Sequence, residues 1–247
     1  MWPVLLQLGP LKLHTYGFFV ALGFLSALIW CSYQSRRRGV DPEIFQDLFF
    51  YVVLAALVGA RLLYVFLNAA YFLAAPWKVF FIWEGGLVFY GGLLLALPVF
   101  VWRLRSRAQP ILPILDIAAP GLVLAQAIGR FGCLAAGCCY GKPWSWGLVF
   151  RHPLAHAPLG LALHPTQLYH ALANFSIFGL LVLLSRRRGK PGFIAAAYLL
   201  LYGCGRFIIE FWRGDPRGFY FHLSTSQWIS ILLVAVAVYL FCRRDPD

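Results

Sequence analysis

Three arginines lie deep inside long apolar stretches of this 247-residue chain: Arg61, Arg130 and Arg206. A charged side chain near the centre of a lipid bilayer costs at least about 2.5–3.5 kcal/mol on insertion scales. Three such residues therefore predict a shared interior site that binds anions. Because a guanidinium stays charged in a low dielectric and binds phosphate through two parallel hydrogen bonds, the candidate anion in a membrane is a lipid phosphate.

The composition predicts the membrane environment that such a site needs. Hydrophobic residues make up 61% of the chain, only 12% of residues are charged, and the mean hydropathy is +0.74. The net charge of +12 and the pI of about 9.8 also occur in nucleic-acid-binding proteins. Here, however, the basic residues form short clusters between apolar runs, with no basic stripe along a helix or strand. We therefore expect no nucleic acid among the partners.

Apolar stretches long enough to cross about 30 Å of hydrocarbon predict seven transmembrane helices, at 15–35, 46–68, 86–103, 113–135, 167–185, 192–212 and 226–242. The fold class is therefore all-α and polytopic, with residues 1–247 forming a single membrane-embedded domain. The first stretch lacks the basic leader and small-residue cleavage site of a removable signal peptide. The stretch at 86–103 is interrupted by glycines, so we expect it to face protein or a wet cavity.

The basic residues between these stretches predict the orientation. Twelve of them fall on one side, namely Arg36–Arg38, Arg103, Arg105, Arg107, Arg186–Arg188, Lys190, Arg243 and Arg244. The other side has six: Lys12, Lys78, Lys142, Arg151, Arg213 and Arg217. The positive-inside rule places the N-terminus outside and the C-terminus in the cytoplasm. The longest connection, 136–166, is then external, and its aromatic residues predict an interfacial cap with a short amphipathic helix.

The six cysteines fall into two groups. Cys31, Cys204 and Cys242 lie in the apolar stretches and are interpreted as small apolar fillers. The other three, Cys133, Cys138 and Cys139, cluster near Arg130 at an outer end. They are interpreted as free packed thiols, as a disulfide pair in an oxidising compartment, or as part of a metal site. We favour free thiols and expect no metal, because adjacent cysteines rarely both reach one ion.

Several motifs resemble the prolipoprotein diacylglyceryl transferase family, in the family's order from about residue 10 to 232. They are Leu13-His14-Thr15-Tyr16-Gly17, Gly59-Ala60-Arg61-Leu62-Leu63-Tyr64, Trp83-Glu84-Gly85-Gly86 with Gly91-Gly92, Gly129-Arg130-Phe131-Gly132-Cys133 with Gly141, His164-Pro165-Thr166-Gln167-Leu168-Tyr169, and Tyr202-Gly203 with Arg206 and Glu210. The resemblance implies an enzyme of the bacterial plasma (inner) membrane that needs no cofactor. Such enzymes transfer the diacylglyceryl group of phosphatidylglycerol to the lipobox cysteine in the signal peptide of an exported prolipoprotein, releasing glycerol 1-phosphate.

The same resemblance implies roles for individual residues. Arg130 and Arg206 match the family's essential arginines and are predicted to bind the phosphate and stabilise charge on it as it departs. The structural alternative is an ion pair, and for Arg206 the partner would be Glu210, four residues later on one helical face. Arg61 would be a supporting interior cation. The full set of predicted substrate-binding residues is Tyr16, His14, Arg61, Gly91, Gly92, Gly132, Cys133, Cys138, Gly141, Tyr202 and Glu210.

Three positions depart from the family pattern. Tyr90 stands where many members have a histidine proposed as the base for the incoming thiol, Cys133 stands for an asparagine, and Cys138 for a glutamate. Tyr90 is predicted as a catalytic residue that shares a cavity with Arg130. It acts there either as a base with a lowered pKa or as a hydroxyl that orients substrate, and the alternative is an interfacial tyrosine. The departures leave open a paralogue with another acceptor, or a membrane thiol oxidoreductase that uses the cysteine cluster.

Overall fold

The computed structural model describes residues 2–8, 11–82, 85–186, 189–216 and 218–243. The motif residues Trp83 and Glu84, and Arg187, Arg188, Arg217 and Arg244 of the basic clusters, lie outside the described residues. By its internal packing the chain forms two compact units. Unit 1 comprises residues 1–31 and 115–247, and unit 2 comprises residues 32–114. The single domain expected from the sequence stays a prediction.

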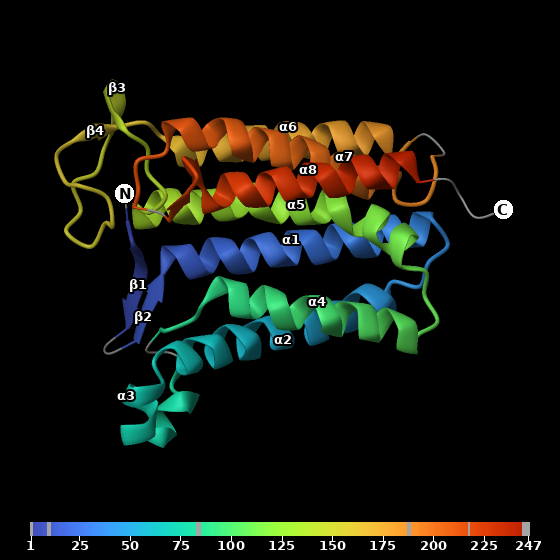
Figure 1. The fold of residues 1–247 in the computed structure, drawn as a ribbon, viewed down its shortest axis with the longest axis horizontal. Helices are drawn as coiled ribbons and strands as arrows, with labels where there is room; N and C mark the ends of the chain where they lie inside the picture. The colour runs from blue at the N-terminus through green and yellow to red at the C-terminus, as the bar shows by residue number, and fades with distance from the viewer. Residues whose placement is uncertain (1, 9–10, 83–84, 187–188, 217, 244–247) are drawn as a thin grey trace. The chain divides into compact units, whose positions relative to one another are not determined.

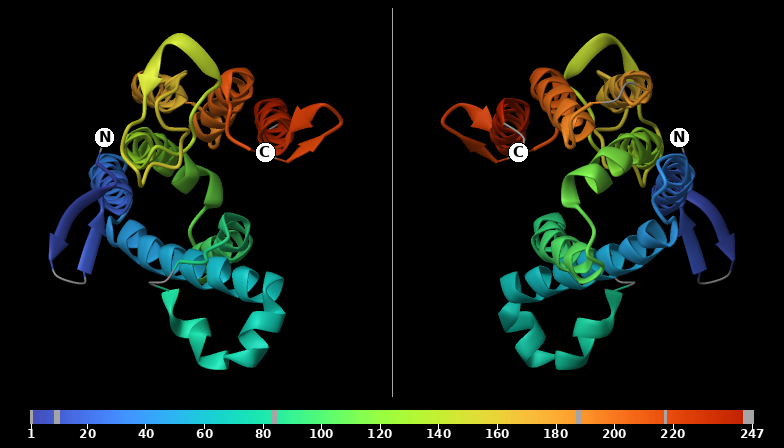
Figure 2. Two further views of the ribbon diagram at one scale, coloured as in Figure 1. Left: turned by 90° about the vertical axis from the view of Figure 1, so that its left-hand side faces the viewer. Right: turned by 90° about the vertical axis from the view of Figure 1, so that its right-hand side faces the viewer.

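Unit 1 is a group of helices that run side by side (Figures 1 and 2). They are the first part of α1 (Thr15–Arg37), most of α5 (Ile111–Ala136), α6 (Thr166–Leu184), α7 (Phe193–Ile209) with the 3-10 turn η3 (Glu210–Trp212), and α8 (Thr225–Cys242). Buried residues of α5, α6 and α7, including Val123, Leu181 and Ala197, form one apolar core. The α8 helix begins with a capping box, in which Ser224 and Gln227 satisfy each other's backbone N–H groups.

Three short hairpins connect or precede these helices. They are β1 (Val4–Leu8) with β2 (Leu11–His14), β3 (Pro143–Val149) with β4 (Ala162–Leu163), and β5 (Phe219–Tyr220) with β6 (Leu223–Ser224), all antiparallel. The prediction of a short amphipathic helix within 136–166 is wrong, because the segment between α5 and α6 contains the β3–β4 hairpin and no helix. Four prolines spread through the segment disfavour a continuous helix by removing backbone donors: Pro143, Pro153, Pro158 and Pro165.

In unit 2, α2 (Glu43–Leu67) packs closely against α4 (Phe89–Ser106). Along the chain, α3 (Ala69–Ala74) and the 3-10 helix η1 (Pro76–Phe80) connect these two helices. A Cβ added to Gly59 would lie 2.4 Å from the carbonyl oxygen of Gly91, and one on Gly91 would lie 2.3 Å from that of Gly59. Only glycine permits this approach of two helix backbones, as is common where helices pack in membranes.

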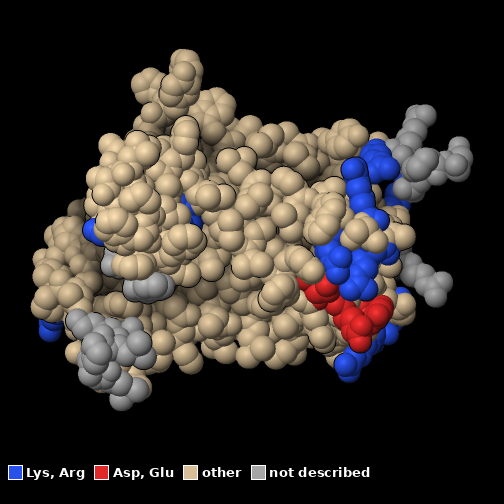
Figure 3. Space-filling model, turned by 90° about the horizontal axis from the view of Figure 1, so that it is seen from below, with Lys and Arg blue, Asp and Glu red and all other residues tan. Residues whose placement is uncertain are grey.

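Charged residues gather at one end of the face shown in Figure 3. In unit 2 the end of α4 and the start of α2 meet, because Arg103 forms an ion pair with Asp47 at 2.5 Å and Arg107 lies 3.6 Å from the same carboxylate. The last turn of α1 also carries Arg36 and Arg37. Each of these helix ends therefore carries charge, as expected of a membrane-facing helix whose polar ends reach water.

Six of the described helices, α1, α2, α5, α6, α7 and α8, are long and apolar enough to cross a membrane. The expected polytopic helical membrane protein is thus confirmed. The α4 helix, which corresponds to the predicted stretch 86–103, is not among the six. It begins only at Phe89, since Gly85 and Gly86 adopt left-handed φ values of 88° and 73° that a helix cannot contain.

Candidate active site

Arg130 lies near the end of α5 and is half-buried. Its electrostatic neighbours include Tyr16, Cys133 and His170. Among the described residues, no side chain or backbone group forms a hydrogen bond or ion pair with its guanidinium. All five of its N–H donors are therefore available to a ligand, and an anion is the ligand they suit.

Arg206, on α7, is held by three side chains. Its Nη1 donates to Nε2 of His170 at 2.8 Å, and its Nη2 donates to the hydroxyl of Ser226 at 2.9 Å and lies 3.5 Å from Glu210. The other carboxylate oxygen of Glu210 accepts a hydrogen bond from Ser224 at 2.8 Å. The ion pair with Glu210 that the sequence offers as the structural alternative is confirmed, and Arg206 is fixed between α6, α7 and α8.

One face of α6 carries four buried polar side chains, none of them among the predicted site residues. Thr166, Gln167, His170 and Asn174 are each at most 2% exposed. Because the guanidinium of Arg206 can only donate, Nε2 of His170 must accept, so the imidazole carries its proton on Nδ1. The recurrence of polar residues every three to four positions in an apolar helix is the signal that identifies this face from sequence.

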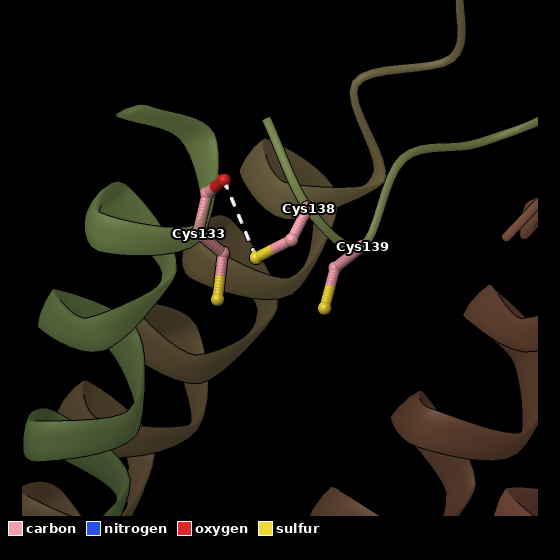
Figure 4. Close-up of side chains that lie close together, drawn as sticks. All are labelled: Cys133, Cys138 and Cys139. Atoms are coloured by element: carbon pink, nitrogen blue, oxygen red, sulfur yellow. Dashed lines mark hydrogen bonds between the residues drawn. The ribbon is translucent and has the colours of Figure 1, made fainter. Parts of the chain in front are cut away.

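The three clustered cysteines come together as the sequence predicts. Cys133 extends from the last turns of α5, while Cys138 and Cys139 lie on the loop that follows, and the three sulfur atoms turn toward a common space (Figure 4). All three Sγ atoms lie within 4.8 Å of one another. The Cys138 thiol donates to the backbone carbonyl of Cys133 at 3.7 Å. All three are free cysteines.

The loop that carries Cys138 and Cys139 is held by the start of α6. Thr166 donates its hydroxyl proton to the carbonyl of Cys139 at 2.6 Å, and Gln167 donates to that of Cys138 at 2.7 Å. The chain turns here because Gly137 and Cys139 adopt φ values of 71° and 60°. A non-glycine residue in this left-handed region is uncommon, and it brings the two neighbouring thiols to the same side.

Arg213 is a further member of the site that the sequence places only among the external basic residues. It is 6% exposed, and its Nε and Nη2 each donate to Asp215 at 2.8 Å. Its Nη1 is buried and has no hydrogen-bond partner among the described residues. Cys139 lies within electrostatic range of this guanidinium. A bridge between Arg213 and Gly141 joins its backbone to the cysteine loop.

The pKa values of the two loop thiols, Cys138 and Cys139, are shifted in opposite directions. The pKa of Cys139 is lowered, because hydrogen bonds from Cys133 and Cys138 stabilise its thiolate and the positive charges of Arg213 and Arg130 attract it. The pKa of Cys138 is raised, because hydrogen bonds to Cys133 and Cys139 hold its proton and burial disfavours its charged form. The positive charges of Arg213 and Arg130 therefore favour a thiolate at Cys139 over one at Cys138.

Other predicted residues of unit 1 contribute mainly through packing. A Cβ on Gly132 would lie 3.1 Å from the carbonyl oxygen of Tyr16, so Gly132 lets α1 approach α5. A Cβ on Gly141 would lie 2.4 Å from the Cβ of His164. Tyr202 stacks on Tyr198 at 5.6 Å, against the core.

His14 ends β2 and is exposed. No hydrogen bond or ion pair of its side chain appears among the described residues. The structure thus gives His14 no interaction that supports or excludes its predicted role in substrate binding.

Arg61, in unit 2, is buried and fully paired. Its five N–H donors face five backbone carbonyls, those of Lys78, Val79, Phe81, Gly85 and Gly86, at 2.6–3.2 Å. The guanidinium also packs against the rings of Tyr64 and Phe72, at 5.6 and 5.3 Å. These contacts order the loop between α3 and α4, and they leave no donor for a substrate phosphate.

The other predicted residues of unit 2 lie at the start of α4. Gly91 and Gly92 are buried against α2, where a Cβ on Gly92 would lie 2.8 Å from the carbonyl oxygen of Ala56. Tyr90 is exposed, and its ring packs edge-on against Phe89 at 5.9 Å. Tyr90 and Arg130 belong to different units, so the cavity they are predicted to share stays a prediction.

Comparison with known proteins identifies the family to which the chain belongs. The family model of prolipoprotein diacylglyceryl transferase matches residues 3–243. The chain belongs to the prolipoprotein diacylglyceryl transferase family.

Relatives within this family are similar over almost their whole length. The phosphatidylglycerol–prolipoprotein diacylglyceryl transferase of Clostridium tetani is 35% identical over 98% of this chain and 97% of its own. Those of Bordetella parapertussis and Streptococcus mutans are each 36% identical, over 99% and 98% of this chain and 97% and 95% of theirs. The resemblance inferred from short motifs is thus confirmed across the chain.

Proposed function

We propose that this protein transfers the diacylglyceryl group of phosphatidylglycerol to the cysteine thiol of a prolipoprotein. The observation that carries the proposal is the unpaired guanidinium of Arg130 in a member of this family. An arginine in an apolar helix is costly unless something neutralises it, and a lipid phosphate matches its planar fork of donors.

Arg206 assists from a fixed position. Its contacts with His170, Ser226 and Glu210 set the direction of its guanidinium before substrate arrives. Charge that is already oriented toward the departing phosphate stabilises the transition state without reorganisation. In the reaction the acceptor sulfur forms a bond to the glyceryl carbon, the bond from that carbon to the phosphate oxygen breaks, and glycerol 1-phosphate leaves. The thiol proton is released, and no electrons are transferred to or from another group.

The remaining predicted roles are part of this proposal. Tyr16, beside Arg130 and the cysteines, contacts the substrate, and Tyr90 orients the acceptor from unit 2. The protein resides in the bacterial plasma membrane with seven spans, α4 included, an external N-terminus and a cytoplasmic C-terminus. The acceptor is the signal peptide of an exported prolipoprotein. No observation favours the alternative of a thiol oxidoreductase.

The direct test uses the purified protein in phosphatidylglycerol micelles with a lipobox peptide. We expect release of glycerol phosphate together with a gain in peptide mass equal to one diacylglyceryl group. A peptide with serine in place of the acceptor cysteine, and micelles of phosphatidylcholine, are the matched controls. Absence of both products with the intact peptide and phosphatidylglycerol would contradict the proposal.

A further inference from the structure

The cysteine cluster has the composition and dimensions of a ligand set for one thiophilic metal ion. Cys133, Cys138 and Cys139 bring three Sγ atoms within 4.8 Å of one another. Zn²⁺ binds thiolate sulfur at about 2.3 Å in a tetrahedral arrangement, which separates two ligand sulfurs by about 3.8 Å. The sulfurs need to approach one another by at most about an ångström to reach this geometry.

Two adjacent cysteines are a poor ligand pair in regular structure, because successive side chains point apart. Here the left-handed conformation of Cys139, with φ of 60°, turns its side chain to the same space as those of Cys138 and Cys133 (Figure 4). Thr166 and Gln167 hold the carbonyls of the two loop cysteines. Adjacent cysteines rarely both reach one ion, but here the backbone conformation brings both side chains to one side.

The surrounding charges match a metal bound by three thiolates. A divalent cation with three thiolates has a net charge of −1, and the guanidinium groups of Arg130 and Arg213 lie within electrostatic range of Cys139. Arg213 is 6% exposed, yet its buried Nη1 has no hydrogen-bond partner among the described residues. The Cys139 side chain lies within hydrogen-bonding and electrostatic reach of this guanidinium, so a buried cation stands beside one of the three sulfurs.

Three ligands leave one position of a tetrahedral ion open. Within the described residues, the group that could hold a metal contains these three cysteines and no fourth Cys, His, Asp or Glu. Structural zinc sites are closed by four protein ligands, whereas catalytic sites keep a fourth position for water or substrate. The geometry is therefore that of an open site.

We propose that Cys133, Cys138 and Cys139 bind one Zn²⁺ ion, and that the acceptor thiol of the prolipoprotein becomes its fourth ligand. The second half of this proposal rests on the proposed transferase function. A coordinated thiol is deprotonated outright, so the ion supplies the nucleophilic thiolate at neutral pH and the proton goes to water. The thiolate then forms the carbon–sulfur bond while the phosphate leaves toward Arg130. The metal ion would thus activate the acceptor thiol in a chain that has Tyr90 where many family members have a histidine.

Metal content tests the first half without reference to activity. We expect the wild-type protein, purified with Zn²⁺ present and then freed of unbound ion, to retain one zinc per chain by elemental analysis. Cys133→Ser, Cys138→Ser and Cys139→Ser should each lose stoichiometric zinc, while the control Cys204→Ser, at an exposed cysteine of α7, should retain it. Substitution by Co²⁺ gives a second readout, namely the intense thiolate absorption of a tetrahedral site. A zinc-free protein, an intramolecular disulfide in the wild type, or zinc retained in all three variants would overturn the proposal.

The activation step has its own test with the zinc-loaded protein, the lipobox peptide and phosphatidylglycerol. We expect the peptide thiol, but not its serine analogue, to change the Co²⁺ spectrum. Removal of the ion should slow transfer at neutral pH by about tenfold or more, and the loss should shrink as pH rises past the free thiol pKa of about 8.5. Full transfer after complete metal removal overturns this inference and leaves the transferase function standing. Zinc binding with no transfer under any condition instead contradicts the transferase function, and with it the activation step.

Discussion

Arg61 and Arg130 are both arginines in apolar helices, yet the two regions that contain them treat the charge in opposite ways. In unit 2, all five N–H donors of Arg61 are matched by backbone carbonyls of the segment from Lys78 to Gly86. In unit 1, Arg130 has no hydrogen-bond or ion-pair partner among the described residues. A cation within a membrane domain can therefore be a structural anchor or a binding group, and the satisfaction of its donors distinguishes the two.

Arg206 stands between these extremes. It is paired with Glu210, His170 and Ser226, but its partners are side chains of other helices and not the carbonyls of one loop. Such a network fixes a guanidinium in position without enclosing it. The order Arg61, Arg206, Arg130 thus runs from structure toward substrate binding, and it predicts a matching order of mutational effects on stability.

The largest effect on folding is expected at Arg61. Arg61→Ala removes the buried donor that five backbone carbonyls of the loop share, and each of these carbonyls that water does not reach costs about 1–3 kcal/mol. We expect little folded protein to be recovered from membranes, as judged by monodispersity in detergent and thermal unfolding. Arg130→Ala is the matched control, since it removes no intramolecular hydrogen bond. Equal stability of the two variants would break the comparison.

A smaller loss of stability is expected at Arg206. Arg206→Ala strands the carboxylate of Glu210, which is 7% exposed, and breaking one side of a buried ion pair typically costs about 3–5 kcal/mol. Replacing both residues, as Arg206→Ala with Glu210→Gln, should restore part of the thermal stability while transfer remains impaired. If the double variant regains full transfer, Arg206 serves only to neutralise Glu210.

Tyr90→Phe should affect the rate and not the fold, because the Tyr90 side chain is exposed. A general base contributes about 10²–10⁴-fold, and a tyrosine with a pKa of about 10 is poorly suited to that role at neutral pH. We therefore expect a loss of less than about 100-fold, with the same pH dependence as the wild type. A larger loss that is relieved at high pH would identify Tyr90 as the base.

The orientation of the chain in the membrane can be tested without any change in activity. Reporter fusions or cysteine labelling at residues 37, 105 and 188 should all read as cytoplasmic, because the basic clusters alternate along the chain. Because α2 is long and apolar enough to cross the membrane, cytoplasmic readings at both 37 and 105 would indicate that α4 returns the chain across it. An external signal at any one of the three positions would contradict the orientation.

Much of the helical architecture could be predicted from sequence, because long apolar stretches in lipid have few alternatives to a helix. Six predicted stretches coincide with α1, α2, α5, α6, α7 and α8, with ends that differ by a few residues. The pairing of Arg206 with Glu210 followed from their spacing, since residues four apart share a helical face. The proximity of Cys133 to Cys138 and Cys139 followed from their closeness in the chain.

The rest depends on backbone geometry that residue types do not encode. The partners of Arg61 are carbonyl oxygens, which every residue carries, so residue types could not predict that all of its donors are paired. The left-handed conformation of Cys139 likewise has no sequence signature, although it decides where the thiol points. By contrast, the spacing of polar residues in the sequence does indicate the polar face of α6 that carries His170. The burial of Arg213 could not be predicted, because in the sequence it is one of several basic residues in the external loops.

The central claim is that the donors of Arg130 are free because they bind the lipid phosphate. The most direct test is the rate of glycerol phosphate release by Arg130→Lys, which keeps the charge but loses the paired hydrogen bonds, in protein shown to unfold at the wild-type temperature. We expect a loss on the order of 100- to 1000-fold, as for removal of one preorganised donor to a developing anion. A folded Arg130→Lys variant that releases glycerol phosphate at the wild-type rate would contradict the claim.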